Sequence, residues 1–139
     1  MLHTWSENTA HSSNYPPQAY GPTEEDLGRL FKELSLPRNS FYITTKLSEL
    51  KDGESVRDAL NAALKRLGVD YVDFYLIHTS APWVKQEGRL SAIWKEFEQL
   101  KRDGLARNIG ISDFNADHLQ ELLKNAEIVP AVHQVRELC

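Results

Sequence analysis

The chain has 139 residues, of which 41% are hydrophobic and 26% are charged, a balance typical of a soluble globular protein. Its formal net charge of −4 leaves no basic surplus for phosphate groups, which argues against a nucleic-acid or anionic-membrane partner. No apolar run approaches the ~20 residues that a membrane-spanning helix needs.

The chain contains a single cysteine, Cys139, which is its last residue. No intramolecular disulfide can therefore form, and a cytoplasmic location is expected. Residues 1–18 carry neither the basic start nor the apolar segment of a signal peptide. No spacing of cysteines and histidines suggests a structural zinc site, so no metal is expected.

The chain divides into two parts of different composition. Residues 1–19 are polar and contain two consecutive prolines, and they are expected to form an irregular or disordered arm. Residues 20–139 are expected to form one folded domain. At its start, Thr23 can cap a helix, with Glu24 placed favourably against the helix dipole. The apolar face of this helix contains Leu27, Leu30, Phe31 and Leu34.

After this helix, strand-like and helix-like segments alternate. In chain order, the sequence predicts a strand at 41–45, a helix opened by Ser55 and ended by Gly68, a strand at 71–77, a helix ended by Gly104, a strand at 107–112, a helix capped by Asn115, and a strand at 131–135. Short connections and strands that are apolar on both faces indicate parallel strands covered by helices.

The expected fold class is therefore α/β, a partial (β/α)8 TIM barrel with four parallel strands and outer helices. An open doubly wound sheet is the alternative, but the chain contains neither of the glycine-rich phosphate-binding motifs typical of such sheets. A complete barrel takes ~250 residues, so this chain has room for about half of one.

Polar residues gather at the carboxyl ends of the predicted strands, where parallel α/β folds place their chemistry. The first strand ends at Lys46, the second at His78 and the third at Ser112 and Asp113, while Gln134 lies in the fourth. Each has an ordinary structural explanation, such as a solvated charge, a hydrogen-bonded core histidine or a helix cap. Burying an unpartnered amide costs about 1–3 kcal/mol, which makes Gln134 the hardest to explain in this way. Their common location favours a functional site.

These segments resemble the aldo-keto reductase family from about residue 20 to residue 135. The segment FYITTKL resembles the family's third barrel strand with its catalytic lysine, and LKRLGVDYVDFYLIH resembles the fourth strand with its catalytic histidine. IWKEFEQLKRDGLARNIGISDF resembles the helix and strand that lead to a Ser-Asn pair, and VPAVHQV resembles the sixth strand with its Asn-Gln motif. The overall character is similar to that of fungal cytosolic members.

The resemblance implies NADPH-dependent reduction of aldehydes and ketones to alcohols. Tyr20 would be the catalytic acid, Lys46 would lower its pKa, and His78 would orient the substrate carbonyl. A free tyrosine has a pKa of ~10, and a neighbouring lysine cation brings it nearer to neutrality. The implied residues for binding NADPH are Ser112, Asp113 and Gln134.

The sequence also departs from the family pattern. The aspartate that pairs with the family's lysine would fall on Tyr15, and no aspartate precedes Asp26. Asp113 replaces an asparagine, which puts an acceptor-only anion in place of an amide. His133 replaces the asparagine before Gln134. The first two strands are not recognisable and the last two would lie beyond residue 139, so the chain is expected to be truncated to the middle of the barrel.

Three functions follow from these observations. The first is a reductase of small-molecule carbonyl substrates, of which this chain carries part of the site. The second is a catalytically incompetent half-barrel that acts by association with another chain, with self-association expected through its open sheet edges. The third is a metal hydrolase that uses His78, Asp113 and His133. The isolated chain is expected to show negligible turnover.

Overall fold

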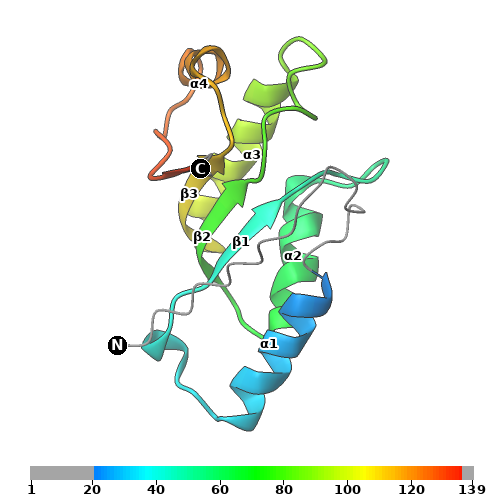
Figure 1. Cartoon of the computed structure of the whole chain (residues 1–139), viewed down its shortest axis with the longest axis vertical. Coiled ribbons are helices and arrows are strands. Elements are labelled where there is room, and N and C mark those ends of the chain that lie inside the picture. The colour runs from blue at the N-terminus through cyan, green and yellow to red at the C-terminus, as the bar shows by residue number, and fades with distance from the viewer. Residues whose placement is uncertain (1–20, 136–139) are drawn as a thin grey trace, which may run out of the picture.

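The computed structural model describes residues 21–135, which form four parallel strands flanked by helices (Figure 1). Tyr20 and the predicted arm, residues 1–19, lie outside the described residues. In chain order the elements are α1 (Gly21–Glu33), the short 3-10 helix η1 (Arg38–Ser40), β1 (Thr44–Leu47), α2 (Val56–Leu67), β2 (Val72–Ile77), α3 (Arg89–Arg102), β3 (Ala106–Ser112), α4 (Ala116–Leu123) and β4 (His133–Gln134).

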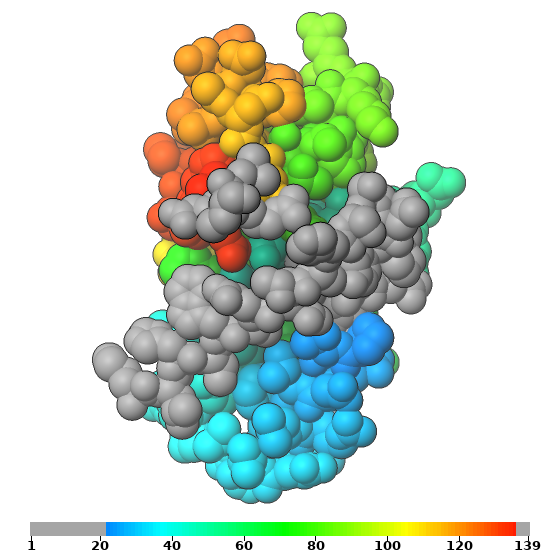
Figure 2. Space-filling view, viewed as in Figure 1, coloured from blue at the N-terminus to red at the C-terminus, as the bar shows by residue number. Residues whose placement is uncertain are grey.

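The strands lie side by side in the order β1-β2-β3-β4, and every neighbouring pair is parallel. This confirms the predicted half-barrel with outer helices. Figure 2 shows the two ends of the molecule: α1 and the segment that leads to β1 form one end, and α4 and the loop after β2 form the other. No helix within residues 21–135 is long and apolar enough to cross a membrane.

The predicted first strand, 41–45, is displaced from the observed β1, Thr44–Leu47. The reason is a side-chain carboxylate that takes the place of a backbone carbonyl as the hydrogen-bond acceptor. The amide of Ile43 donates to the Asp73 carboxylate at 2.9 Å instead of to a backbone carbonyl, so the regular ladder begins after it. At the other edge, Ala131 donates to the carbonyl of Ile109, so the pairing of β4 extends beyond its two assigned residues.

Three of the predicted helix caps are observed, whereas the prediction that Thr23 caps the first helix is wrong, because Thr23 lies within α1. The Ser55 side chain accepts from the amide of Asp58 and the Asp58 carboxylate accepts from the amide of Ser55, a capping box that starts α2. Gly68 ends α2 in the left-handed conformation, with φ 67°. Asn115 caps α4 by accepting from the amide of His118 at 2.8 Å. The sequence predicted all three positions.

The hydrophobic core lies between the sheet and the helices α2 and α3. Tyr75 of β2 stacks on Phe97 of α3 with ring centroids 4.6 Å apart, and Trp94 of α3 also stacks on Phe97, with centroids 5.8 Å apart. Helix α1 lies along α2 and not on the sheet (Figure 1). The two helices approach closely at Gly28, where an added Cβ would lie 2.3 Å from the carbonyl oxygen of Arg66.

Glu24 does more than favour the dipole of α1. Its carboxylate is buried, accepts a hydrogen bond from the Thr45 hydroxyl at 2.5 Å and pairs with Arg66 at 2.7 Å. One side chain therefore joins α1, β1 and α2. A buried carboxylate needs such partners, because the free energy lost when it leaves water is otherwise larger than the free energy gained by packing.

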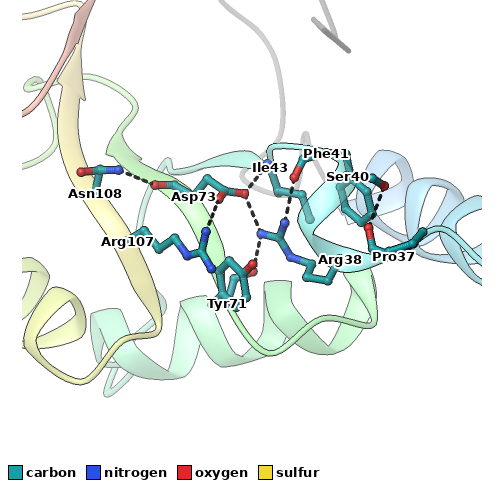
Figure 3. A network of polar contacts seen from close by, with 9 residues as sticks. All are labelled: Pro37, Arg38, Ser40, Phe41, Ile43, Tyr71, Asp73, Arg107 and Asn108. Carbon is teal, nitrogen blue, oxygen red and sulfur yellow. Dashed lines mark hydrogen bonds and ion pairs between the residues drawn. The ribbon is translucent and has the colours of Figure 1, made fainter. Parts of the chain in front are cut away.

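A second polar network holds the amino ends of the strands together (Figure 3). The buried carboxylate of Asp73 accepts from Arg38 Nη2 at 2.6 Å and lies 3.6 Å from Arg107 Nη1. The ring of Tyr71 has one guanidinium 4.0 Å away, from Arg38, and another 4.1 Å away, from Arg107. In barrels the amino end of the strands serves stability, and this network fits that role.

Candidate active site

The opposite end of the sheet brings the predicted site residues together. In the parallel register, Leu47 pairs with Ile77, Ile77 with Ile111, and Ile111 with His133. The next residue along each strand therefore falls in one row across the sheet. This row, called here the polar row, consists of Ser48, His78, Ser112 and Gln134.

The polar row and Lys46 share a face of the sheet. Side chains alternate between faces along a strand, so Lys46 and Ser48 point to the same side, while Leu47 points to the other. Leu47, Ile77 and Ile111 are fully buried in the core against the helices. The polar row and Lys46 thus occupy the face away from the helices, which is the inner face of a barrel.

Backbone hydrogen bonds keep the row aligned beyond the assigned strands. The amide of His78 donates to the carbonyl of Leu47 at 2.9 Å, and the amide of Asp113 donates to the carbonyl of Gln134 at 3.1 Å. His78 is also held by its side chain, because its Nδ1 atom lies 3.0 Å from the Ser48 hydroxyl. The sequence-based prediction missed Ser48, although its position two residues after Lys46 was a usable signal.

Lys46 is a half-buried cation. Burial lowers the pKa of its amine, and the negative charge of Asp113 acts in the opposite direction by raising that pKa. A lysine amine in such surroundings gives up its proton more readily than one in water, and functional lysines are commonly tuned in this way.

The other predicted residues differ in exposure. Ser112 is buried and Gln134 is half-buried, so both can present a polar group to a ligand without being fully solvated. Asp113 is half-buried with φ 51°, a left-handed backbone that interrupts the alternation of β3. Tyr20, the predicted acid, lies outside the described residues.

The register separates His133 from this site. His133 pairs with Ile111 and therefore lies on the helix side of the sheet, where its Nε2 atom accepts from the amide of Phe114 at 3.2 Å. A metal site of His78, Asp113 and His133 would need all three on one face. Within residues 21–135, no group of three His, Cys, Asp or Glu side chains is arranged to hold a metal ion. The metal-hydrolase alternative therefore has no geometric support.

A second hydrogen bond fastens the loop after β2. The hydroxyl of Ser80, which is buried, lies 2.7 Å from Nδ1 of His118 on α4. This contact ties the turn that follows His78 to a neighbouring helix. Neither residue was singled out from the sequence, because their pairing depends on the tertiary arrangement of α4.

An open hollow of about 660 Å³ lies between the loops that follow β1 and β2. Its lining mixes acidic and basic side chains and consists of residues 49–55, Pro82, Trp83, Lys85, Gln86, Arg89 and Glu96. Lys46, His78, Ser112 and Gln134 do not line this hollow. We therefore base the candidate site on the inner face of the sheet and not on the hollow.

Comparison with known proteins gives a consistent result. The family model described as "Aldo/keto reductase family" matches residues 9–137. The NADPH-dependent alpha-keto amide reductase of Saccharomyces cerevisiae is 41% identical over 117 residues, which are 81% of this chain and 37% of the yeast protein. The NAD/NADP-dependent indole-3-acetaldehyde reductase of Schizosaccharomyces pombe is 36% identical over 118 residues, 85% of this chain and 40% of that protein.

Solved structures agree with the sequence relatives. A Bombyx mori aldo-keto reductase in complex with NADP has a TM-score of 0.66 and 31% identity, over 84% of this chain and 41% of its own. Aldose reductase from Giardia lamblia has a TM-score of 0.72 and 28% identity, over 84% of this chain and 46% of its own. The chain spans about two fifths of the length of the curated relatives it matches. With its half-barrel and this family match, the chain belongs to the aldo/keto reductase family.

Proposed function

We propose that this chain contributes the lysine–histidine wall and part of the nicotinamide site of an NADPH-dependent reductase of aldehydes and ketones. The polar row, with Lys46 on the same face, is the observation that supports it. A carbonyl reductase needs a group that orients the carbonyl oxygen and a cation that tunes a proton donor. His78 and Lys46 supply these two groups from adjacent strands.

The residues present suit a nicotinamide carboxamide, which offers one carbonyl acceptor and one amino donor. The Ser112 hydroxyl and the Gln134 amide can each donate and accept, and they are neighbours in the polar row. The cofactor would supply a hydride to the carbonyl carbon when bound. The names of the yeast relative and of the NADP-bound Bombyx mori structure support a phosphorylated nicotinamide cofactor.

The chain's own residues would handle the oxygen of the substrate. His78, held at Nδ1 by Ser48, would donate from Nε2 to the carbonyl oxygen and fix its orientation. Tyr20 would deliver the proton to that oxygen. The cationic Lys46 would favour the tyrosinate form, which lowers the pKa of the tyrosine and makes proton transfer near neutral pH faster.

A chimera tests this proposal. The aligned stretch of the yeast alpha-keto amide reductase is replaced by residues 20–135, and NADPH oxidation is followed with an α-keto amide and a reactive aldehyde. Saturable reduction that Lys46→Met and His78→Ala each lower by at least ~10²-fold supports it. Lys95→Met, on the exposed face of α3, is the matched control. A folded chimera without activity, or one insensitive to both substitutions, would refute it.

A second candidate is association with another chain, which the arrangement of the sheet favours. Among the described residues, β1 and β4 each have a strand neighbour on one side only. Edge strands present backbone groups that can pair with a second chain, and a second half-barrel would offer open strand edges of its own. The 139-residue chain alone is then expected to self-associate and to show negligible NADPH oxidation. Light scattering that reports a monomer at all concentrations would contradict this.

A cytoplasmic location is part of the proposal. It is supported by the composition, because a chain with one cysteine forms no intramolecular disulfide, the bond that oxidising compartments favour.

A further inference from the structure

Ser80 is a buried serine in the loop that follows β2, two residues after His78. Its carbonyl accepts from the amide of Trp83 at 2.9 Å and from that of Val84 at 3.3 Å, so Ser80 begins a tight turn. The side chain of Trp83 is 4% exposed and belongs to the hydrophobic core, so the turn is packed against the body of the protein. The path of the backbone as it leaves His78 therefore depends on what holds Ser80.

The side chain of Ser80 is held from another element. Its hydroxyl lies 2.7 Å from Nδ1 of His118, which is in the first turn of α4. A hydroxyl and a neutral imidazole can each donate and accept, whereas a buried hydroxyl without a partner would cost free energy. The backbone of His118 is itself fixed, because its amide donates to the Asn115 side chain that caps α4. The imidazole therefore holds Ser80 from the fixed start of a helix.

The segment from His78 to Ser80 is attached to the rest of the structure on two sides. Toward β1, the amide of His78 donates to the carbonyl of Leu47 at 2.9 Å. Toward β3, the aligned pairs of β2 end at Ile77, the residue before His78. Beyond that point, the contact of Ser80 with His118 joins the loop after β2 to the helix after β3, at the carboxyl end of the strands (Figure 1).

We propose that His118 is a positioning residue that acts through Ser80: it keeps the turn after β2 closed and thereby holds His78 in the polar row. The inference rests on the proposed function, in which His78 orients the substrate carbonyl. Loops at the carboxyl ends of barrel strands carry the groups that act on the substrate, and a displacement of about 1 Å can cost ~10²-fold in rate. A helix that carries none of the proposed catalytic groups would thus contribute to the rate.

The chemistry of the contact provides a discriminating set of variants. In histidine, Nδ1 is attached to Cγ, as are the amide oxygen and nitrogen of asparagine, whereas those of glutamine are attached to Cδ. His118→Asn is therefore expected to keep a hydrogen-bonding group near Ser80, and both His118→Gln and His118→Leu are expected to lose it. Gln120→Leu, at an exposed position of the same helix, is the matched control.

Hydrogen exchange of the full chain without cofactor measures the turn directly. The amides of His78, Trp83 and Val84 all donate to backbone carbonyls, so their exchange reports whether the segment 78–84 is closed. In His118→Leu and His118→Gln, peptides that span this segment are expected to exchange about 10-fold faster, as for the loss of one hydrogen bond. His118→Asn and Gln120→Leu are expected to exchange like the parent.

Three results of the exchange experiment would overturn the inference. The first is unchanged exchange of the segment 78–84 in His118→Leu. The second is an equal increase in His118→Asn. The third is an increase that is as large in α2 as in this segment, because it would show a general loss of stability.

Kinetics of the chimera test whether the turn acts on His78. His118→Leu is expected to lower kcat about 10-fold and to leave the KM for NADPH unchanged, and His118→Asn is expected to restore kcat. In a His78→Ala background, His118→Leu is expected to have little further effect, because residues that act as one unit are not additive. An equal decrease in that background overturns the inference. An inactive chimera refutes the reductase proposal, and the exchange experiment, which needs no activity, then decides whether His118 holds the turn.

Discussion

The imidazole of His78 and the hydroxyl of Ser48 are neighbours in the polar row, with 3.0 Å between Nδ1 and Oγ. This contact engages one ring nitrogen and fixes the rotation of the ring. In the proposed reaction, Nε2 would be the atom that donates to the substrate carbonyl. A serine at the end of β1 therefore controls a histidine at the end of β2.

Removing that hydroxyl is expected to slow reduction without unfolding the protein. In the chimera, Ser48→Ala removes this contact with the His78 ring, and a decrease in kcat on the order of 10-fold is expected, since misplacing a reacting group by about 1 Å costs up to ~10². Ser48→Thr retains the hydroxyl and is expected to restore most of the rate. A steady-state assay with both variants checks this, and equal rates for Ala and the parent would show that Ser48 does not position His78.

The network at the amino ends of the strands is expected to govern stability. Asp73→Ala leaves the guanidinium of Arg38 half-buried without its carboxylate and removes the acceptor for Ile43. Breaking a buried ion pair in this way costs about 3–5 kcal/mol. Urea unfolding followed by circular dichroism measures the loss, with the exposed Asp70→Ala as control. A loss below ~1 kcal/mol would mean that water replaces the carboxylate at little cost.

At the close crossing of α1 and α2, replacing Gly28 by alanine has two opposite effects on the free energy of unfolding. Alanine normally favours a helix over glycine by about 1 kcal/mol. At Gly28, however, the new methyl group would overlap the carbonyl of Arg66, and overpacking of this kind costs about 1–3 kcal/mol. Gly28→Ala is therefore expected to lower the unfolding free energy, while Glu33→Ala at the exposed end of α1 should change it little. A more stable Gly28→Ala variant would show that the helices separate easily.

The lowered pKa of Lys46 predicts a pH dependence of stability with a definite sign. Between the folded pKa and the unfolded value of 10.5, the unfolded chain binds more protons than the folded one, so the unfolding free energy of the parent rises with pH. Lys46→Met has no ionisable amine at this position, so its unfolding free energy lacks this pH-dependent contribution. The stability difference, variant minus parent, is thus expected to be largest near pH 7 and to shrink as the pH approaches 10.5.

The difference, and not either stability alone, is the quantity to measure. Burial also raises the pKa of Tyr75, which stays protonated in the folded core and destabilises both proteins at alkaline pH when the unfolded tyrosine ionises. That contribution is common to parent and variant and cancels. Parallel urea titrations at several pH values provide the difference, and a difference that grows with pH would contradict the buried-amine explanation.

The sequence was most informative where a local pattern determines the structure. The caps at Ser55, Gly68 and Asn115 depend on a few neighbouring residues, and the helices began and ended where these residues predicted. The strand order followed from the repeated βα spacing, which leaves few parallel arrangements. Lys46, His78, Ser112 and Gln134 were found as strand-end residues, although their roles remain predictions.

Contacts between distant segments were not predictable in the same way. The burial of Glu24 depends on Thr45 and Arg66, which lie on two other elements. The displacement of β1 depends on Asp73, which is 30 residues away from the amide it accepts from. A single sequence gives the pattern of polar and apolar residues, but it does not say which polar residue will meet which partner once the strands are aligned.

The polar row contains one side chain from the end of each strand. Which residues it contains therefore depends on the register of the four strands. A slip of one residue in β2 would replace His78 by Ile77 or Thr79 and would turn the imidazole to the helix side. No strand can shift alone and leave the row intact. In the chimera, the reductase activity of variants in β2 would therefore depend on the strand register as well as on the chemistry of the side chains. A register shift of a single residue would be enough to abolish it.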